Sequence, residues 1–122
     1  MRKVIGGLLI AAGLVGGGQV QAQWRGQDIQ RQVAITVLLA ADWAQTRQIA
    51  RNPQRWEELN PLLGSHPSEV RVRNYFLAVA AASAMLTVAL PEEWRESAQL
   101  GQVKLEGLTV LRNRQIGLRF SF

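Results

Sequence analysis

Apolar residues in this chain gather in two long runs, and a third segment mixes leucines with polar residues. The first run, residues 33–44, has Asp42 as its only charged residue. The second, residues 75–90, carries no charge over sixteen positions. The third, residues 92–113, alternates apolar, amide and charged side chains. Their lengths and composition predict an all-α chain with two hydrophobic helices and a third, amphipathic helix.

Start and stop signals set the expected helix ends. The first helix is predicted over residues 28–51, with Asp28 as its cap. The second is predicted over residues 67–90. The third is predicted over residues 91–113, with Pro91 in its first position, where proline is tolerated.

The N-terminus has the three parts of an export signal. Arg2 and Lys3 give a positive start, a glycine-rich apolar stretch follows, and residues 20–22 match a small-x-small cleavage pattern. We therefore expect residues 1–22 to be a signal peptide or an uncleaved N-terminal anchor. Residues 23–122 then form a single helical membrane domain of a bacterial protein.

The second run decides between a membrane helix and the core of a soluble bundle. Sixteen residues rise about 24 Å, against roughly 30 Å of hydrocarbon. Only Ser83 and Thr87 could form a polar stripe on this helix, and Tyr75 and Trp94 flank it as interfacial aromatic residues would. The pattern favours embedding in the bacterial inner membrane, with a soluble periplasmic three-helix bundle as the alternative.

Charge does not settle the orientation at this stage. If the mature N-terminus is outside, the connection between the first two helices lies in the cytoplasm. Five arginines flank that connection: Arg47, Arg51, Arg55, Arg71 and Arg73. Five basic residues also occupy the C-terminal segment: Arg95, Lys104, Arg112, Arg114 and Arg119. The two counts tie under the positive-inside rule.

One face of the first helix is polar. Asp42, Gln45, Thr46 and Ile49 follow the i, i+3, i+4, i+7 spacing and share that face. One interpretation is an intramembrane functional site, because ionisable groups in a membrane are functional candidates. The other is structural pairing, since antiparallel helices would bring Asp42 level with three residues of the second helix: Arg73, Asn74 and Tyr75.

The segment between the first two helices is interpreted as a shaped turn. Residues 54–59 are expected to form one helical turn in the membrane interface, anchored by Trp56. Asn60 caps a short turn that Pro61 begins. Gly64 permits the positive φ that closes it.

Composition argues against catalysis and metal binding. The chain has no cysteine and a single histidine, His66, beside Ser65; one of these two is expected to cap the second helix. Phosphate loops and dinucleotide fingerprints are absent. We therefore predict no enzymatic activity, no catalytic residues and no cofactor.

The net charge of +5 falls when the leader is left out. Without Arg2 and Lys3, twelve basic residues face nine acidic ones, and they are spread along the chain. Nucleic acid is therefore not an expected partner.

The tail alternates Leu118, Phe120 and Phe122 with small or polar residues. This pattern is typical of the last strand of an outer-membrane barrel, but such barrels need at least eight strands. A tail whose phenylalanines enter lipid or pack on the bundle is the simpler interpretation.

Three short motifs resemble a group of small bacterial and phage-encoded membrane proteins. They are "DWAQT" at 42–46, "ELNPLLG" at 58–64 and "NYF" at 74–76, and the likeness covers roughly residues 33–113. The resemblance implies a membrane location and assigns no activity. Together with the helix face above, it marks a polar cluster of structural or functional interest: Asp42, Gln45, Thr46, Glu58, Asn60, Pro61, Gly64 and Asn74.

These expectations lead to a small integral inner-membrane protein of structural or protein-interaction type. Its partners would be the lipid bilayer and either a second copy or another membrane protein. A phage holin-like protein that permeabilises membranes is one alternative, and the soluble periplasmic helical bundle is the other.

Overall fold

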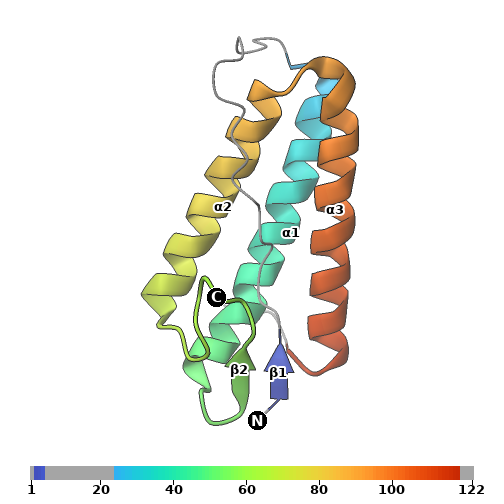
Figure 1. Ribbon diagram of the computed structural model, residues 1–122. Helices are drawn as coiled ribbons and strands as arrows, with labels where there is room; N and C mark the ends of the chain where they lie inside the picture. Colours follow the sequence, from blue (N-terminus) through green and yellow to red (C-terminus); the bar gives the residue numbers. More distant parts are fainter. Residues whose placement is uncertain (1, 5–23, 119–122) are drawn as a thin grey trace.

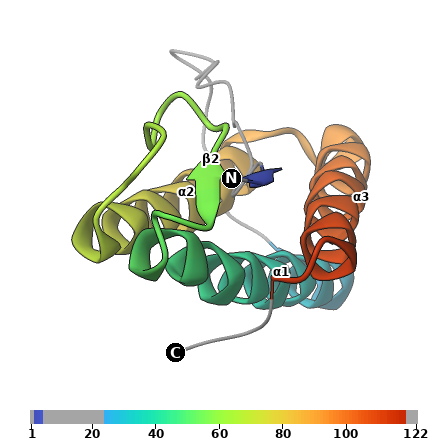
Figure 2. The same ribbon diagram turned by 90° about the horizontal axis from the view of Figure 1, so that it is seen from below.

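Three antiparallel helices make up most of the computed structural model, which describes residues 2–4 and 24–118. They are α1 (Gly26–Arg51), α2 (Glu69–Ala89) and α3 (Glu92–Gln115). The helices run side by side, with α1 running down, α2 up and α3 down in the view of Figure 1. Seen along the bundle, α2 and α3 lie on either side of α1 (Figure 2). The predicted all-α class is confirmed.

The helix starts follow ordinary capping chemistry, although not always at the expected residue. Asp28 lies in the first turn of α1, where its carboxylate accepts a 2.9 Å hydrogen bond from the backbone N–H of Arg25. Ser68 caps α2 by accepting a 3.1 Å bond from the backbone N–H of Arg71. The predicted cap at Ser65 or His66 is therefore wrong. Pro91 stands just before α3.

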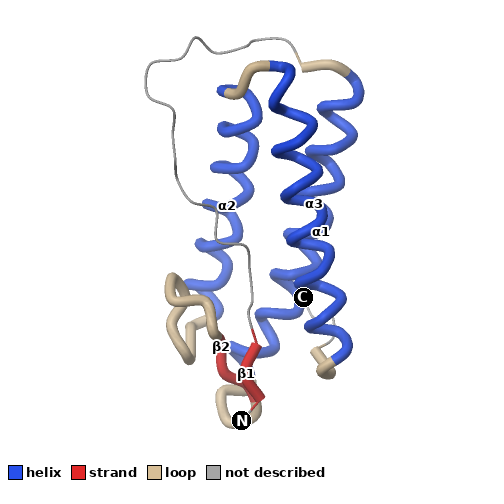
Figure 3. Tube along the Cα trace, turned by 45° about the vertical axis from the view of Figure 1, so that its right-hand side comes forward, coloured by secondary structure: helices blue, strands red, loops and turns tan. Residues whose placement is uncertain are grey.

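The segment expected to be a helical turn is extended instead. Strand β2 (Trp56–Glu58) pairs in parallel with β1 (Arg2–Val4) at the end of the bundle that holds the α1–α2 connection (Figure 3). Trp56 is 2% exposed and packs with Ile49 and Leu118. The predicted interfacial anchor is therefore wrong, because this indole closes the lower end of the bundle.

The described residues on either side of the apolar N-terminal stretch lie at opposite ends of the bundle. Val4 ends β1 at the lower end, and Trp24 precedes α1 at the upper end (Figure 1). Cleavage after Ala22 would remove β1 and leave β2 unpaired. Whether residues 1–22 are removed stays a prediction, and the predicted role of Phe120 and Phe122 lies outside the described residues.

The turn at Asn60 forms as predicted. The Asn60 side-chain oxygen accepts a 3.0 Å bond from the backbone N–H of Leu62, and its carbonyl accepts from Gly64 at 3.1 Å. Gly64 has φ 82°, in the left-handed region that glycine adopts without strain. The turn places Leu63, 1% exposed, against the helices.

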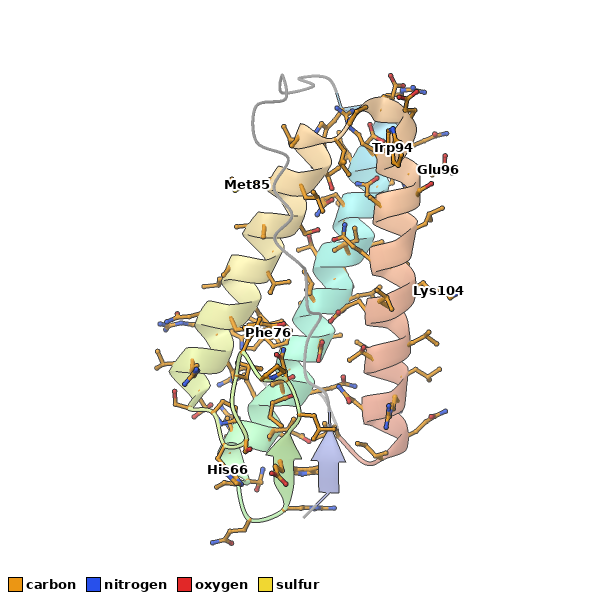
Figure 4. The ribbon with its side chains drawn as sticks, viewed as in Figure 1. His66, Phe76, Met85, Trp94, Glu96 and Lys104 are labelled. Carbon is orange, nitrogen blue, oxygen red and sulfur yellow. The ribbon has the colours of Figure 1, made fainter. Side chains whose placement is uncertain are left out.

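A small apolar cluster fills the space between α1, α2 and the connection: Ile35, Leu39, Leu63, Val72, Phe76 and Val79. Phe76 points from α2 toward α1 (Figure 4). No buried hydrophobic residue of this cluster comes from α3 among the residues described. The third helix adds only the partly buried Val103 to this cluster, so its contact with α1 depends mainly on other interactions.

The outer surface of the bundle is apolar instead. Large exposed hydrophobic side chains occur on all three helices and include Val33, Val37, Leu77, Met85, Leu100, Leu105, Leu108 and Leu111. Met85 points away from the bundle (Figure 4). A water-soluble domain usually has the opposite distribution, with its large apolar side chains buried and its polar side chains at the surface.

Within the described ranges, α2 is the one helix long and apolar enough to cross a membrane. Only 28% of its most apolar window is buried. The expectation of two such hydrophobic helices is therefore not confirmed, since α1 carries polar residues, Asp42 among them, along its length.

The two kinds of glycine in this fold give a matched test. Gly64→Ala should destabilise the protein by about 1–2 kcal/mol, because alanine pays a steric cost at positive φ. Gly101→Ala should stabilise it by about 1 kcal/mol, since Gly101 lies inside α3 with open space around it. Thermal unfolding in detergent measures both. Equal effects of the two substitutions would contradict the turn described here.

Candidate functional site

Polar side chains line the space between the helices. In α3 the buried positions are all polar and recur at near-heptad spacing: Arg95, Gln99, Gln102, Glu106 and Asn113. The polar residues that α1 buries are Asp28, Gln32, Asp42, Gln45 and Thr46. Of the buried residues that the structure describes, fourteen are polar or charged and ten are hydrophobic. The contact between α1 and α3 is therefore mainly a polar one.

Gln32 is the centre of the upper part of this interior. Its amide nitrogen donates to the Ser83 hydroxyl at 3.0 Å. Its amide oxygen accepts from Thr87 at 3.0 Å and from Gln99 at 3.2 Å. Ser83 in turn donates to Gln102. One side chain of α1 thus links α2 and α3, and all of its polar atoms are satisfied.

Asp28 and Arg95 form a buried ion pair at the upper end. The Arg95 guanidinium donates to the Asp28 carboxylate at 3.3 Å and to the Leu90 carbonyl at 3.2 Å. Arg31 donates to the second carboxylate oxygen of Asp28 at 2.8 Å. The Arg25 backbone N–H, then Arg95 and Arg31, hold the pKa of Asp28 below its usual range, against the effect of burial. This ion pair fixes the turn between α2 and α3 against the start of α1.

A second acidic region lies lower in the bundle, and no basic side chain of the described residues pairs with it. Asp42 and Glu106 are both 0% exposed and face each other across α1 and α3. One Asp42 oxygen accepts from Thr46 at 3.2 Å and, at the long limit of 3.5 Å, from Asn113. The other Asp42 oxygen and both Glu106 oxygens have no hydrogen-bond donor among the described residues.

Amide side chains flank this acid pair. Gln45 donates to the Val110 carbonyl at 2.9 Å, and Asn113 donates to the Gln45 amide oxygen at 3.3 Å. These bonds hold α1 and α3 together below the acids, just as Gln32 and Gln99 hold them above. The acid pair therefore lies between two sets of hydrogen bonds that join α1 to α3.

The connection contributes a third acid. Glu58, 2% exposed, accepts a 2.9 Å bond from the Asn60 backbone N–H. The Asn60 amide donates to the Tyr75 hydroxyl at 2.8 Å. Both Glu58 and Tyr75 lie close enough to Asp42 for their charges to interact with it. The level of Asp42 in the bundle is therefore close to that of Tyr75, as expected from the sequence.

Arg73, which was expected to lie at the level of Asp42, does not pair with it. Arg73 is exposed and bonds the side chain of its neighbour Asn74, at 3.3 Å and 3.4 Å. Asp42 points instead toward α3. The helix rotation that buries Phe76 turns Arg73 outward, so no guanidinium reaches the acid.

The sequence-predicted cluster is thus partly brought together. Asp42, Gln45 and Thr46 are 0% exposed, and Glu58 and Asn60 lie just below them. Pro61 is exposed, and Gly64 acts through the turn. Asn74 is exposed and apart from the group. The exposed His66 also lies outside it (Figure 4).

Sequence reasoning missed the contribution of α3. Gln99, Gln102, Glu106 and Asn113 were included in the predicted amphipathic helix, but none of them was singled out. The available signal was their near-heptad spacing, which predicts a single polar stripe. In an inverted bundle that stripe faces inward.

This interior is suited to linking helices and to holding a proton. Within the described ranges, no three histidine, cysteine or acidic side chains come together as metal ligands would. Comparisons with protein-family models, curated proteins and solved structures gave no match. The arguments below therefore depend on the geometry alone.

Replacing Asp28 tests the upper ion pair. Asp28→Asn should destabilise the protein by about 3 kcal/mol, because it leaves Arg95 buried without a counter-charge. The wild type should lose stability as pH falls below the ordinary carboxyl pKa of 3.8, since a lowered folded pKa makes the ionised form the stabilising one. This acid-induced loss should shrink in the variant. Glu93→Gln, at an exposed site, serves as the control in pH-dependent thermal unfolding. An Asp28→Asn variant as stable as this control would refute the role of the pair.

Proposed function

We propose that the protein is a small integral inner-membrane protein of structural or protein-interacting type, in which three helices cross the bilayer as one bundle. The observation that carries this proposal is the inverted polarity of the bundle. Its interior is a hydrogen-bonded polar network, and its surface carries leucine, valine and methionine side chains. In hydrocarbon, polar groups must be satisfied internally and apolar groups can face outward.

The exposed apolar side chains would be costly in water. Val37, Leu77 and Met85 are 61%, 58% and 60% exposed. Burying such a side chain fully is worth roughly 1.5–3 kcal/mol, and a soluble domain of this size would use these residues for its core. Acyl chains remove that cost, because they are as apolar as the side chains themselves.

The packing extends the argument from α2 to the whole bundle. Hydrogen bonds join α1 to α3 near both ends, from Gln99 with Asp28 to Gln45 with Val110. Gln32 joins α1 to α2. Three antiparallel helices linked in this way lie side by side at the same level. If lipid surrounds α2, it therefore surrounds α1 and α3 as well.

Lys104 makes it unfavourable for α3 to enter a membrane by itself. It is exposed at the middle of the helix and points outward (Figure 4). A central lysine costs about 2.5–3.5 kcal/mol on insertion scales, and each leucine returns only about 0.3–0.6. The four exposed leucines of α3 do not offset that cost. We infer that α3 enters the membrane as the partner of α1, through their shared polar bonds.

The arrangement of the bundle supports one of the two orientations between which the sequence counts tie. Because α3 returns to the lower end, Arg112 and Arg114 join the arginines around the connection (Figure 1). Seven basic residues outside β1, whose Arg2 and Lys3 also belong to this end, then mark the lower end: Arg47, Arg51, Arg55, Arg71, Arg73, Arg112 and Arg114. Only three mark the upper end among the described residues: Arg25, Arg31 and Arg95. The positive-inside rule therefore places the connection in the cytoplasm.

A structural role agrees with how the polar residues are used. Gln32, Gln45 and Gln99 are each engaged in bonds between helices. The apolar outer face is free to contact lipid and a membrane partner, either a second copy or another protein.

Fractionation tests the membrane location. In bacteria expressing the full chain, the protein should stay with the membranes after alkaline carbonate treatment, float with lipid on a sucrose gradient, and require detergent for solubility. Release by carbonate into a monodisperse soluble form would overturn the proposal and favour the periplasmic bundle. Collapse of the membrane potential on induction would instead favour the holin-like alternative.

Cysteine labelling tests the orientation, and the chain has no native cysteine to interfere. Ser65→Cys lies in the exposed connection, and Glu93→Cys lies in the exposed first turn of α3. In spheroplasts, an impermeant maleimide should label position 93 at once and position 65 only after lysis. The reverse result would contradict the orientation, and labelling of both before lysis would contradict the crossing.

A further inference from the structure

We propose that Asp42 and Glu106 form a proton-binding site, in which one shared proton joins α1 to α3. The site goes beyond a purely structural role, because its occupancy makes the packing of two helices depend on pH. It rests on the internal packing of the bundle and holds whatever medium surrounds it.

The carboxylate oxygens of the acid pair lack hydrogen-bond donors. Asp42 and Glu106 are both 0% exposed, and three of their four carboxylate oxygens lack a hydrogen-bond donor in the described structure. A buried acceptor without a donor costs about 1–3 kcal/mol, and more when it is charged. A proton between the facing oxygens turns one carboxylate into a donor and the other into its acceptor. One bond then satisfies an oxygen on each side.

The charges around the acid pair also favour a shared proton. From the elements packed around the pair, the interacting ionisable groups are Glu58 on β2 and Tyr75 on α2. Neither can supply a positive charge. Arg95 is held by Asp28 at the upper end. Two adjacent buried carboxylates cannot both ionise without strong repulsion, so the stable state keeps one proton and one negative charge.

Hydrogen bonds to Asp42 hold the single negative charge of the pair. Thr46 and Asn113 both direct donors at the same oxygen of Asp42. The shared proton serves the other Asp42 oxygen, so both oxygens of this carboxylate are bonded. Because the two acids titrate as one coupled unit, the proton belongs to the pair.

The pair lies nearer to the arginine-rich end of the bundle than to the opposite end. Asp42 lies five residues above Arg47, and Glu106 lies six residues above Arg112. At 1.5 Å per residue, the site is about 8–9 Å inside the arginines of the lower end. Loss of the proton would place two like charges between α1 and α3 and loosen the lower half of the bundle. The site therefore couples helix packing to the pH on the arginine-rich side.

Infrared difference spectroscopy of the full chain in lipid nanodiscs tests the site. At neutral pH the wild type should show the C=O stretch of a protonated carboxyl group, sensitive to deuterium exchange and lost on alkaline titration. Asp42→Asn and Glu106→Gln should each abolish the band, because an amide can donate to the remaining carboxylate. Glu96→Gln, an exposed acid on α3, should retain it (Figure 4).

Absence of the band in the wild type at neutral pH, or its persistence in both site variants, would overturn the proposal. Unfolding of the wild type alone gives a second measurement if a variant fails to fold. The folded pair holds a proton that the unfolded chain releases, so the folding equilibrium constant should fall as pH rises, by up to tenfold per pH unit for one proton. A flat profile from neutral to alkaline pH would contradict the site. The unfolding measurement does not depend on the fractionation result.

Discussion

Gln32 provides the interaction on which the bundle depends. Its amide donates to Ser83 and accepts from Thr87 and Gln99, so one side chain of α1 holds both neighbouring helices. Around it the interior is built from directional hydrogen bonds, and the buried apolar side chains lie mainly between α1, α2 and the connection, with a second group at Ile49, Trp56 and Leu118. Because the leucines of α3 are not used inside, they lie outside. The inverted surface is thus a consequence of the polar interior.

The polar interior also explains why the two ends behave differently. At the upper end Asp28 meets Arg95 and Arg31, so its charge is compensated. Lower down, Asp42 meets Glu106 and no arginine reaches it. The same helix pair therefore carries one fixed ion pair and one site whose charge depends on a proton. A bundle held by apolar packing alone would contain neither.

Much of the fold could be predicted from local chemistry. Asn60 and Gly64 each have a turn-making property that does not depend on the rest of the chain, so the turn is confirmed. The ends of α2 and α3 were close to correct for the same reason. Trp56 was placed wrongly because a strand of three residues is set by its tertiary partners and not by its own propensity.

The site was harder to predict, because it depends on which face of each helix turns inward. The spacing of Asp42, Gln45 and Thr46 showed that they share a face, but it could not show what lies opposite. Glu106 completes the pair from 64 positions further along the chain. The distribution of basic residues could not be predicted for the same reason, since Arg112 joins the arginine-rich end only because α3 packs back along α1.

The central claim is that the exposed apolar faces meet acyl chains. Spin labels at Val33, Leu77 and Leu105, one on each helix, test it most directly in reconstituted bilayers. Their side chains are 56%, 58% and 55% exposed. Collisions with oxygen, which concentrates in hydrocarbon, should far exceed collisions with a water-soluble nickel chelate at all three sites. Dominant collisions with the chelate would show that these faces lie in water and would contradict the account.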